Sequence, residues 1–117
     1  MPTARDFINP AALTLHFTEH GQDFGALDEA DYLAQARTFL EAPLPANSAI
    51  REGVRATSGE IVRYDSATEA FAVVQANGTI KTFYKPMPRH LAPPGTPRRK
   101  THGFATNLDY FLDTCTK

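Results

Sequence analysis

The sequence contains one cysteine, no tryptophan and no apolar run near the roughly 20 residues that a membrane-spanning helix needs. The single Cys115 excludes an internal disulfide framework, and its place near the C-terminus suggests an incidental thiol on a terminal helix. The first residues lack the positive start and long apolar centre of a signal peptide. The remaining composition is ordinary for a globular protein and predicts a single domain over residues 1–117, with no membrane contact.

Acidic residues are absent between residues 70 and 108, although the chain as a whole is almost neutral. That segment carries six Lys or Arg and two His, whereas residues 1–69 carry eleven acids against five bases. The formal charge is therefore −6 for residues 1–69, +6 for residues 70–108 and −1 for the tail. This distribution predicts a cationic half that favours contact with a polyanion such as RNA.

Capping signals predict two helices in the first part of the chain. Asn9 followed by Pro10 is a favourable helix start, and this helix should run to about His20, with Gly21 as its left-handed stop. A second helix should begin at Asp28, because the acids of its first turn interact well with the helix dipole, and should end at the prolines that follow it.

Short β-rich runs predict an antiparallel meander after these helices. The expected strands are Ile50–Ala56, Glu60–Tyr64, Ala70–Gln75 and Thr79–Lys85. Asn77-Gly78 is a strong hairpin signal, since both turn residues need a positive φ, and it places Val73 opposite Thr82. In that register, one face of the hairpin carries Phe71, Val73, Ile80, Thr82 and Tyr84.

The last part of the chain predicts a basic, Pro-rich loop from Pro86 to Thr101 and a short helix that begins after Thr106. A loop of this length indicates function or disorder rather than a simple connection. The predicted fold class is therefore α+β: two N-terminal helices packed on a central antiparallel four-stranded sheet, followed by the basic Pro-rich loop and a short C-terminal helix.

His16 and His20 are the first candidates for chemistry. They lie four residues apart, so they share one face of the predicted helix and flank the apolar side made by Leu13 and Phe17. Imidazole accepts or donates a proton near neutral pH, so this pair suits general acid–base catalysis. The alternative for either ring is simple packing at the edge of the core.

Residues 16–20 (HFTEH) also match the H-x-x-E-H pattern of inverted zincins, in which the two His bind zinc and the Glu acts as base. A third ligand would have to come from another segment, and Glu52, Glu60 and Glu69 carry no motif that marks them. We therefore expect no metal or other cofactor, and keep a small zinc hydrolase as the less favoured alternative.

The acid-free half supplies groups that bind phosphate and stabilise charge on it. Thr82 and Tyr84 on the last predicted strand, together with His102 beyond the loop, complete the candidate catalytic set. The candidate RNA-binding cations are Arg55, Lys81, Lys85, Arg98, Arg99 and Lys100. The alternative is that the hydroxyls are ordinary strand formers and the cations are solvated.

Three segments resemble the C-terminal toxin domains of bacterial polymorphic and contact-dependent inhibition toxins, in the group of metal-independent RNases typified by barnase, EndoU, colicin D and RelE. The segments are HFTEHGQDFGALDEADYLAQARTFL, GEIVRYDSATEAFAVVQANGTIKTFYKP and THGFATNLDYF. The resemblance implies two helices packed on an antiparallel sheet, endoribonuclease activity that is often directed against tRNA, and an immunity protein that neutralises the toxin.

The resemblance also carries over to single positions. His20-Gly21 matches the histidine near the end of the first helix in these domains, Thr82 and Tyr84 match polar positions on the last strand, and His102 matches the histidine of the closing segment. A lysine is common before the first-helix histidine, and this chain has Glu19 there.

These observations predict a metal-independent endoribonuclease that acts through the 2′-hydroxyl of its substrate. His20 would take the hydroxyl proton, and His16 or His102 would protonate the leaving oxygen. The phosphorane would be stabilised by Lys81, Arg55 or Lys85. The expected partners are RNA and an immunity protein, with no obligate homo-oligomer, and the expected setting is a secreted or cell-surface toxin that acts in the target-cell cytoplasm. The alternative is a non-catalytic basic binding module of the same fold.

Overall fold

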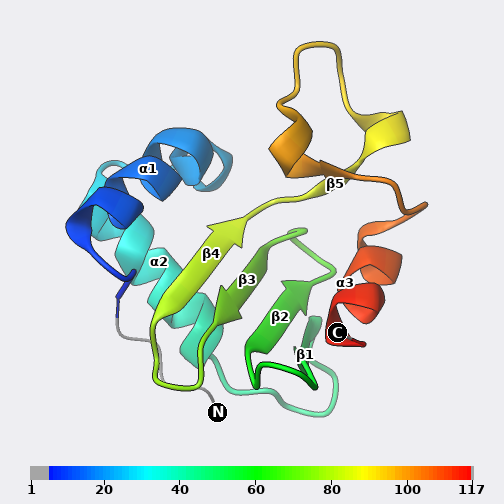
Figure 1. Ribbon diagram of the computed structural model, residues 1–117, viewed down its shortest axis with the longest axis horizontal. Helices are drawn as coiled ribbons and strands as arrows, with labels where there is room; N and C mark the ends of the chain where they lie inside the picture. Colours follow the sequence, from blue (N-terminus) through cyan, green and yellow to red (C-terminus); the bar gives the residue numbers. More distant parts are fainter. Residues whose placement is uncertain (1–5, 117) are drawn as a thin grey trace.

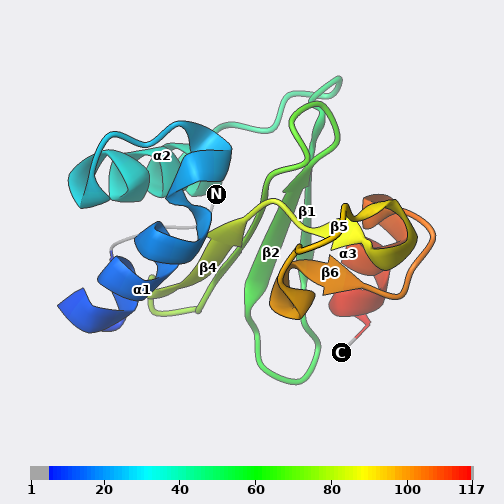
Figure 2. The same cartoon turned by 90° about the horizontal axis from the view of Figure 1, so that it is seen from above.

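The computed structural model describes residues 6–116, which form a four-stranded antiparallel sheet between two layers of helices (Figure 1). The strands follow one another in the order β1-β2-β3-β4 and span Ile50–Val54, Ile61–Asp65, Phe71–Val74 and Ile80–Tyr84. Helices α1 (Pro10–His20) and α2 (Glu29–Glu41) lie on one side, and α3 (Asn107–Cys115) lies on the other (Figure 2). The predicted α+β class, with its central antiparallel sheet and C-terminal helix, is confirmed.

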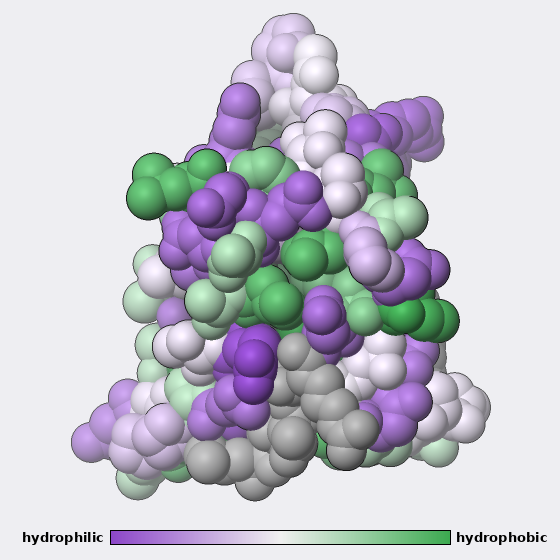
Figure 3. Space-filling model, turned by 90° about the vertical axis from the view of Figure 1, so that its left-hand side faces the viewer, coloured by the Kyte–Doolittle hydropathy of each residue, from purple (hydrophilic) through white to green (hydrophobic). Residues whose placement is uncertain are grey.

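Each face of the sheet has its own hydrophobic core, because successive side chains of a strand point to opposite faces. The core under α1 and α2 contains Phe7, Tyr32, Ala36, Leu40, Ala70, Ala72, Val74, Ile80 and Phe83. The core under α3 contains Val62, Tyr64, Phe71, Val73, Tyr84 and Phe111. Figure 3 shows the side that carries α1 and α2, where hydrophobic residues at the centre and at the edges lie among hydrophilic ones.

A β-bulge in the hairpin of β3 and β4 corrects the predicted face of one residue. The pairs Val73–Thr82 and Phe71–Tyr84 are as expected, but the register shifts at Val74, which pairs with Ile80. An extra residue in one strand reverses the alternation beyond it. Ile80 therefore points into the core under α1 and α2, and not to the face that carries Thr82 and Tyr84.

The helices begin as predicted, but the end of α1 differs. The side chains of Asn9, Asp28 and Thr106 accept the backbone N–H bonds that cap the three helices. Gly21 has a right-handed φ of −58° and continues into a 3-10 turn (Gly21–Phe24); the left-handed residue is Gly25, with a φ of 62°. Gly21 is needed for space, because a Cβ there would lie 2.7 Å from the Phe17 ring.

The Pro-rich segment is folded and not an open loop. Short strands β5 (Met87–Pro88) and β6 (Thr101–His102) pair in parallel, and single 3-10 turns cover Arg89–Leu91 and Arg98–Lys100. The pairing returns the chain to the sheet just before α3 and brings residues 98–100 close to the end of α1. Within residues 6–116, no helix combines the length and apolar character that crossing a bilayer requires.

A buried arginine joins the sheet to α2. Arg63 on β2 is fully buried, and its Nη1 donates to the carbonyl oxygens of Phe39 (3.0 Å) and Ala42 (2.7 Å) at the end of α2. Its Nε donates to Glu52 on β1 at 2.8 Å. Carbonyls in the last turn of a helix have no partner within the helix, so Arg63 serves as the C-terminal cap of α2.

We predict that Arg63→Met lowers the free energy of unfolding by about 3 kcal/mol, because it leaves helix carbonyls and a carboxylate without their partner. Urea denaturation measures the change. Arg51→Gln on the exposed edge strand β1 is the matched control and should change stability by less than about 0.5 kcal/mol. Equal effects of the two variants would show that Arg63 does not hold the helix end.

Candidate active site

A cavity of about 250 Å³ lies between α1 and β4, and it brings together five residues that the sequence indicated. Its lining consists of His16, Glu19, His20, Thr82, Tyr84 and Arg99. Two imidazoles, two hydroxyls, a carboxylate and a guanidinium thus share one hollow. The rings of the first helix therefore do lie beside the edge of the sheet, as the sequence interpretation required.

Helix α1 and strand β4 fix the geometry of this cavity. The rings of His16 and His20 lie one turn apart, with centroids separated by 5.7 Å. His16 stacks on Phe7 at 4.9 Å, and His20 packs against Tyr84 at 5.3 Å. Thr82 is half-buried, and its hydroxyl has no hydrogen-bond partner among residues 6–116, so it is available to a ligand.

Burial keeps both imidazoles neutral at neutral pH. His20 is 5% exposed, and burial lowers its pKa to about 4, with further lowering by Lys100 and His16 and partial opposition from Glu19 and Asp23. Burial also lowers the pKa of His16. A neutral imidazole accepts a proton, so the free protein holds its histidines in the form that a general base requires.

Glu19, a candidate base only in the zinc alternative, lines the cavity. Its Oε2 forms an ion pair with Arg99, 3.0 Å from Nε, and lies 3.6 Å from Nε2 of His20. The second distance is too long for a hydrogen bond, and it becomes an ion pair only when His20 is protonated. The adjacency of Glu19 and His20 within HFTEH was the signal that could have revealed it. The ion pair with Glu19 keeps the guanidinium of Arg99 at the cavity.

Four of the six predicted RNA-binding cations are paired with carboxylates of the acidic half. Arg55 and Lys81 both bind Glu60, at 2.7 and 2.8 Å, and neither lines the histidine cavity. Arg99 and Lys100 bind the acids near the end of α1. The separation of charge along the sequence is therefore not a separation in space, which corrects the expected cationic half.

The remaining two cations lie apart from these ion pairs. Lys85 lies over the ring of Phe24, with 5.4 Å between Nζ and the ring centroid, and does not line the histidine cavity. Arg98 is exposed on the turn that carries Arg99. The phosphorane-stabilising role expected of Lys81, Arg55 or Lys85 thus has a better-placed candidate in Arg99.

His102 lies outside the cavity and is 6% exposed. Its Nδ1 accepts a bond from the N–H of Phe104 at 3.2 Å, so Nε2 carries the proton and donates to Oδ1 of Asn107 at 2.7 Å. Its ring stacks on Tyr110 at 4.4 Å. With both ring nitrogens bonded, His102 anchors the segment before α3, and this geometry provides no free nitrogen for the leaving oxygen.

Tyr84 connects the cavity to that anchor. Its hydroxyl lies 2.9 Å from the hydroxyl of Tyr110, which stacks on His102. Burial and the neighbouring Tyr110 raise the pKa of Tyr84, so the side chain remains a protonated hydroxyl. It therefore acts as a hydrogen-bonding group and not as a base.

No group of three His, Cys, Asp or Glu side chains within residues 6–116 is arranged to hold a metal ion. The HFTEH segment supplies His16, Glu19 and His20, but Glu52 and Glu60 turn to Arg63 and Arg55 instead. The residues present therefore do not fit the zinc alternative.

No family model matches the chain, and no curated protein matches it either. Among solved structures, the chain is similar to a ribonuclease from Escherichia coli complexed with its inhibitor protein. The two chains share 19% sequence identity over 76% of this chain and 96% of that chain, with a TM-score of 0.49.

We predict that the free energy of unfolding falls as the pH is lowered from 6.5 towards 4. In this window His20 binds a proton in the unfolded chain but not in the folded protein, because the pKa of His20 in the folded protein is about 4. His20 alone should lower the free energy of unfolding by roughly 2 to 3 kcal/mol over this window. Urea titrations across the window should show a smaller fall in His20→Gln, whereas His90→Gln, which removes an exposed histidine, should keep the wild-type fall.

Proposed function

We propose that this chain is a metal-independent endoribonuclease domain. The proposal is supported by the cavity between α1 and β4. This cavity contains the imidazoles of His16 and His20, the hydroxyls of Thr82 and Tyr84 and the guanidinium of Arg99. This set contains a proton acceptor, a proton donor and a cation for the phosphate, which are the groups that RNA cleavage by an internal hydroxyl needs. A substrate that supplies its own nucleophile needs no metal-bound water.

In the proposed reaction, neutral His20 takes the proton of a ribose 2′-hydroxyl while its oxygen forms a bond to the adjacent phosphorus. The bond from phosphorus to the 5′-oxygen then breaks, and His16, in the protonated form that it takes at acidic pH, gives its proton to that oxygen. The products are a 2′,3′-cyclic phosphate and a new 5′-hydroxyl. Arg99 stabilises the phosphorane charge, and Glu19 positions Arg99. His102 is an anchor in this scheme and takes no part in proton transfer.

The finer parts of the proposal concern the biological setting. We propose that the RNA is tRNA, that a cognate immunity protein neutralises the domain, and that it belongs to a secreted or cell-surface toxin acting in the cytoplasm of a target cell. The order of the three segments quoted above supports these points. A non-catalytic basic binding module of the same fold is the second candidate, because Glu19 stands where a lysine is common in the domains that the sequence resembles.

We predict that the purified domain cleaves tRNA in the presence of a chelator and leaves cyclic phosphate ends. His20→Gln and His16→Gln should each lower kcat/KM by about 10²- to 10⁴-fold, the range for loss of a general acid or base. His90→Gln is the control, since this exposed ring lies outside the cavity. Binding without any cleavage would favour the binding module, and inhibition by the chelator would favour a metal enzyme.

We predict a bell-shaped dependence of kcat/KM on pH with its maximum below 6.5. Activity should rise through a pKa near 4, as His20 loses its proton and becomes a base. It should fall above the lowered pKa of His16, as the acid loses its proton. Initial rates at low substrate concentration measure this profile. A maximum above pH 7 would contradict the assignment of the two roles.

A further inference from the structure

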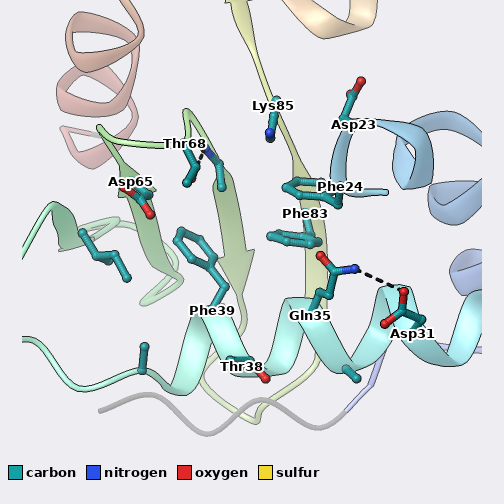
Figure 4. Close-up of a pocket in the computed structure, with 14 residues that line it drawn as sticks. Asp23, Phe24, Asp31, Gln35, Thr38, Phe39, Asp65, Thr68, Phe83 and Lys85 are labelled. Carbon is teal, nitrogen blue, oxygen red and sulfur yellow. Dashed lines mark hydrogen bonds between the residues drawn. The ribbon is translucent and has the colours of Figure 1, made fainter. Parts of the chain in front are cut away.

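The hydroxyl of Tyr84 belongs to a pair that connects the histidine cavity to α3. Tyr84 lines this cavity, and its hydroxyl oxygen lies 2.9 Å from that of Tyr110, where either atom can be the donor. Phe83 and Lys85, the neighbours of Tyr84 in the sequence, line a separate cavity of about 700 Å³ between α2 and the sheet (Figure 4). Tyr84 is among the site residues that the sequence indicated, whereas Tyr110 is not.

Two bonded hydroxyls can present one proton to a ligand. Each phenol carries one proton, so one hydroxyl of the pair donates and the other accepts. When Tyr110 donates to Tyr84, the proton of Tyr84 is free for an acceptor in the cavity. The bond from Tyr110 also makes Tyr84 a stronger donor, because neighbouring hydrogen bonds polarise one another.

Packing fixes the hydroxyl of Tyr110 beside Tyr84. The Tyr110 ring stacks on His102, with centroids 4.4 Å apart and an interplanar angle of 4°, and its centroid lies 5.2 Å from that of Phe71. His102 is itself held by hydrogen bonds to Asn107 and to the N–H of Phe104. A donor held in this way needs little ordering when a ligand arrives, which is the property of a preorganised site.

The imidazoles of the cavity have ring nitrogens that no protein group satisfies. Nδ1 of His16 and Nδ1 of His20 are buried and have no hydrogen-bond partner among residues 6–116. A buried polar atom without a partner is costly, and a ligand that supplies the partner regains that free energy. The cavity therefore suits a polar ligand.

The charges near the Tyr84 hydroxyl suit an anionic acceptor. Burial and Tyr110 raise the pKa of Tyr84, and the positive charge of Arg55 partly opposes this rise, so a guanidinium acts on a phenol that stays protonated. A second guanidinium, that of Arg99, lines the cavity, and the carboxylate there, Glu19, is its ion-pair partner. A phenol in these surroundings can donate to a phosphate oxygen, and hydrogen bonds to a charged acceptor are the stronger ones.

We propose that Tyr84 donates a hydrogen bond to a non-bridging oxygen of the substrate phosphate, and that Tyr110 positions and strengthens this donor. The inference rests on the proposed function for the identity of the ligand. Tyr84 keeps its proton throughout, and His20 and His16 move the protons of the reaction. Tyr84 is therefore a catalytic residue, because it touches the substrate, and Tyr110 is a positioning residue.

The cleavage test compares Tyr84→Phe, Tyr110→Phe and the double variant. Tyr84→Phe should lower kcat/KM by about 10²-fold, the effect of losing one donor to the charge of a transition state. Tyr110→Phe keeps the ring on His102 and should lower kcat/KM by about tenfold. The double variant should match Tyr84→Phe to within about twofold, because Tyr110 acts only through Tyr84. Losses that multiply in the double variant would overturn the proposal.

Two further variants separate this role from a structural one. Tyr64→Phe removes a buried hydroxyl from the same face of the sheet, where it bonds Glu69 at 2.7 Å, and should leave kcat/KM unchanged. Replacement of Tyr110 by 3-fluorotyrosine keeps the ring and makes the hydroxyl a stronger donor, so kcat/KM should equal or exceed the wild-type value. This second variant decides the matter if Tyr110→Phe does not fold. Equal losses in Tyr110→Phe and Tyr64→Phe, or a loss in the fluorinated protein, would assign Tyr110 to the core alone.

A binding assay distinguishes failure of this proposal from failure of the ribonuclease proposal. Calorimetry measures the affinity for a 2′-deoxydinucleotide, which lacks the hydroxyl that attacks phosphorus. Tyr84→Phe should weaken binding by about tenfold and Tyr110→Phe by about threefold. This pattern in a protein that never cuts RNA would support the hydroxyl pair and overturn the ribonuclease. Cleavage that Tyr110→Phe leaves at the wild-type rate would overturn the pair alone, and a protein that neither binds nor cuts would overturn both.

Discussion

The buried guanidinium of Arg63 is the interaction on which the arrangement of layers depends. It comes from the second strand, caps the end of α2 and binds Glu52 on the edge strand, so one side chain joins three elements. With that end fixed, the Tyr32 hydroxyl of α2 donates to the carbonyl oxygen of Phe83 on β4. Helix α1 packs against both α2 and β4, and this packing places its histidines at the edge of the sheet.

Ion pairs also determine where the cations of the candidate site lie. The acids near the end of α1 bind the cations of the turn at residues 98–100, and Glu60 binds Arg55 and Lys81. The pairs at the surface contribute little to stability, because water and salt screen them. Arg99 is mostly exposed, so a phosphate can compete with Glu19 for it at small cost. The ion pair between Glu19 and Arg99 therefore places beside the imidazoles a cation that a phosphate can bind.

Burial and strand alternation divide the chemistry between the two sides of β4. Desolvation holds His20 neutral on one side, where Thr82 and Tyr84 also lie. On the other side, Phe83 and Lys85 line a larger cavity between α2 and the sheet. Since neighbouring residues of a strand point in opposite directions, one short strand supplies groups to the proposed reaction site and to the lining of a second cavity.

Local signals in the sequence determined the helix starts at Asn9, Asp28 and Thr106, the order of the strands and the pairing across the Asn77-Gly78 turn, because capping, turn chemistry and period depend on neighbouring residues. They also indicated His16 and His20, whose spacing alone puts them on one helix face. Only the tertiary structure decided three further points, and each depends on pairing or packing with another element of the fold. It placed Ile80 in the other core through a bulge, buried His102 in hydrogen bonds, and paired the cations of one half with the acids of the other.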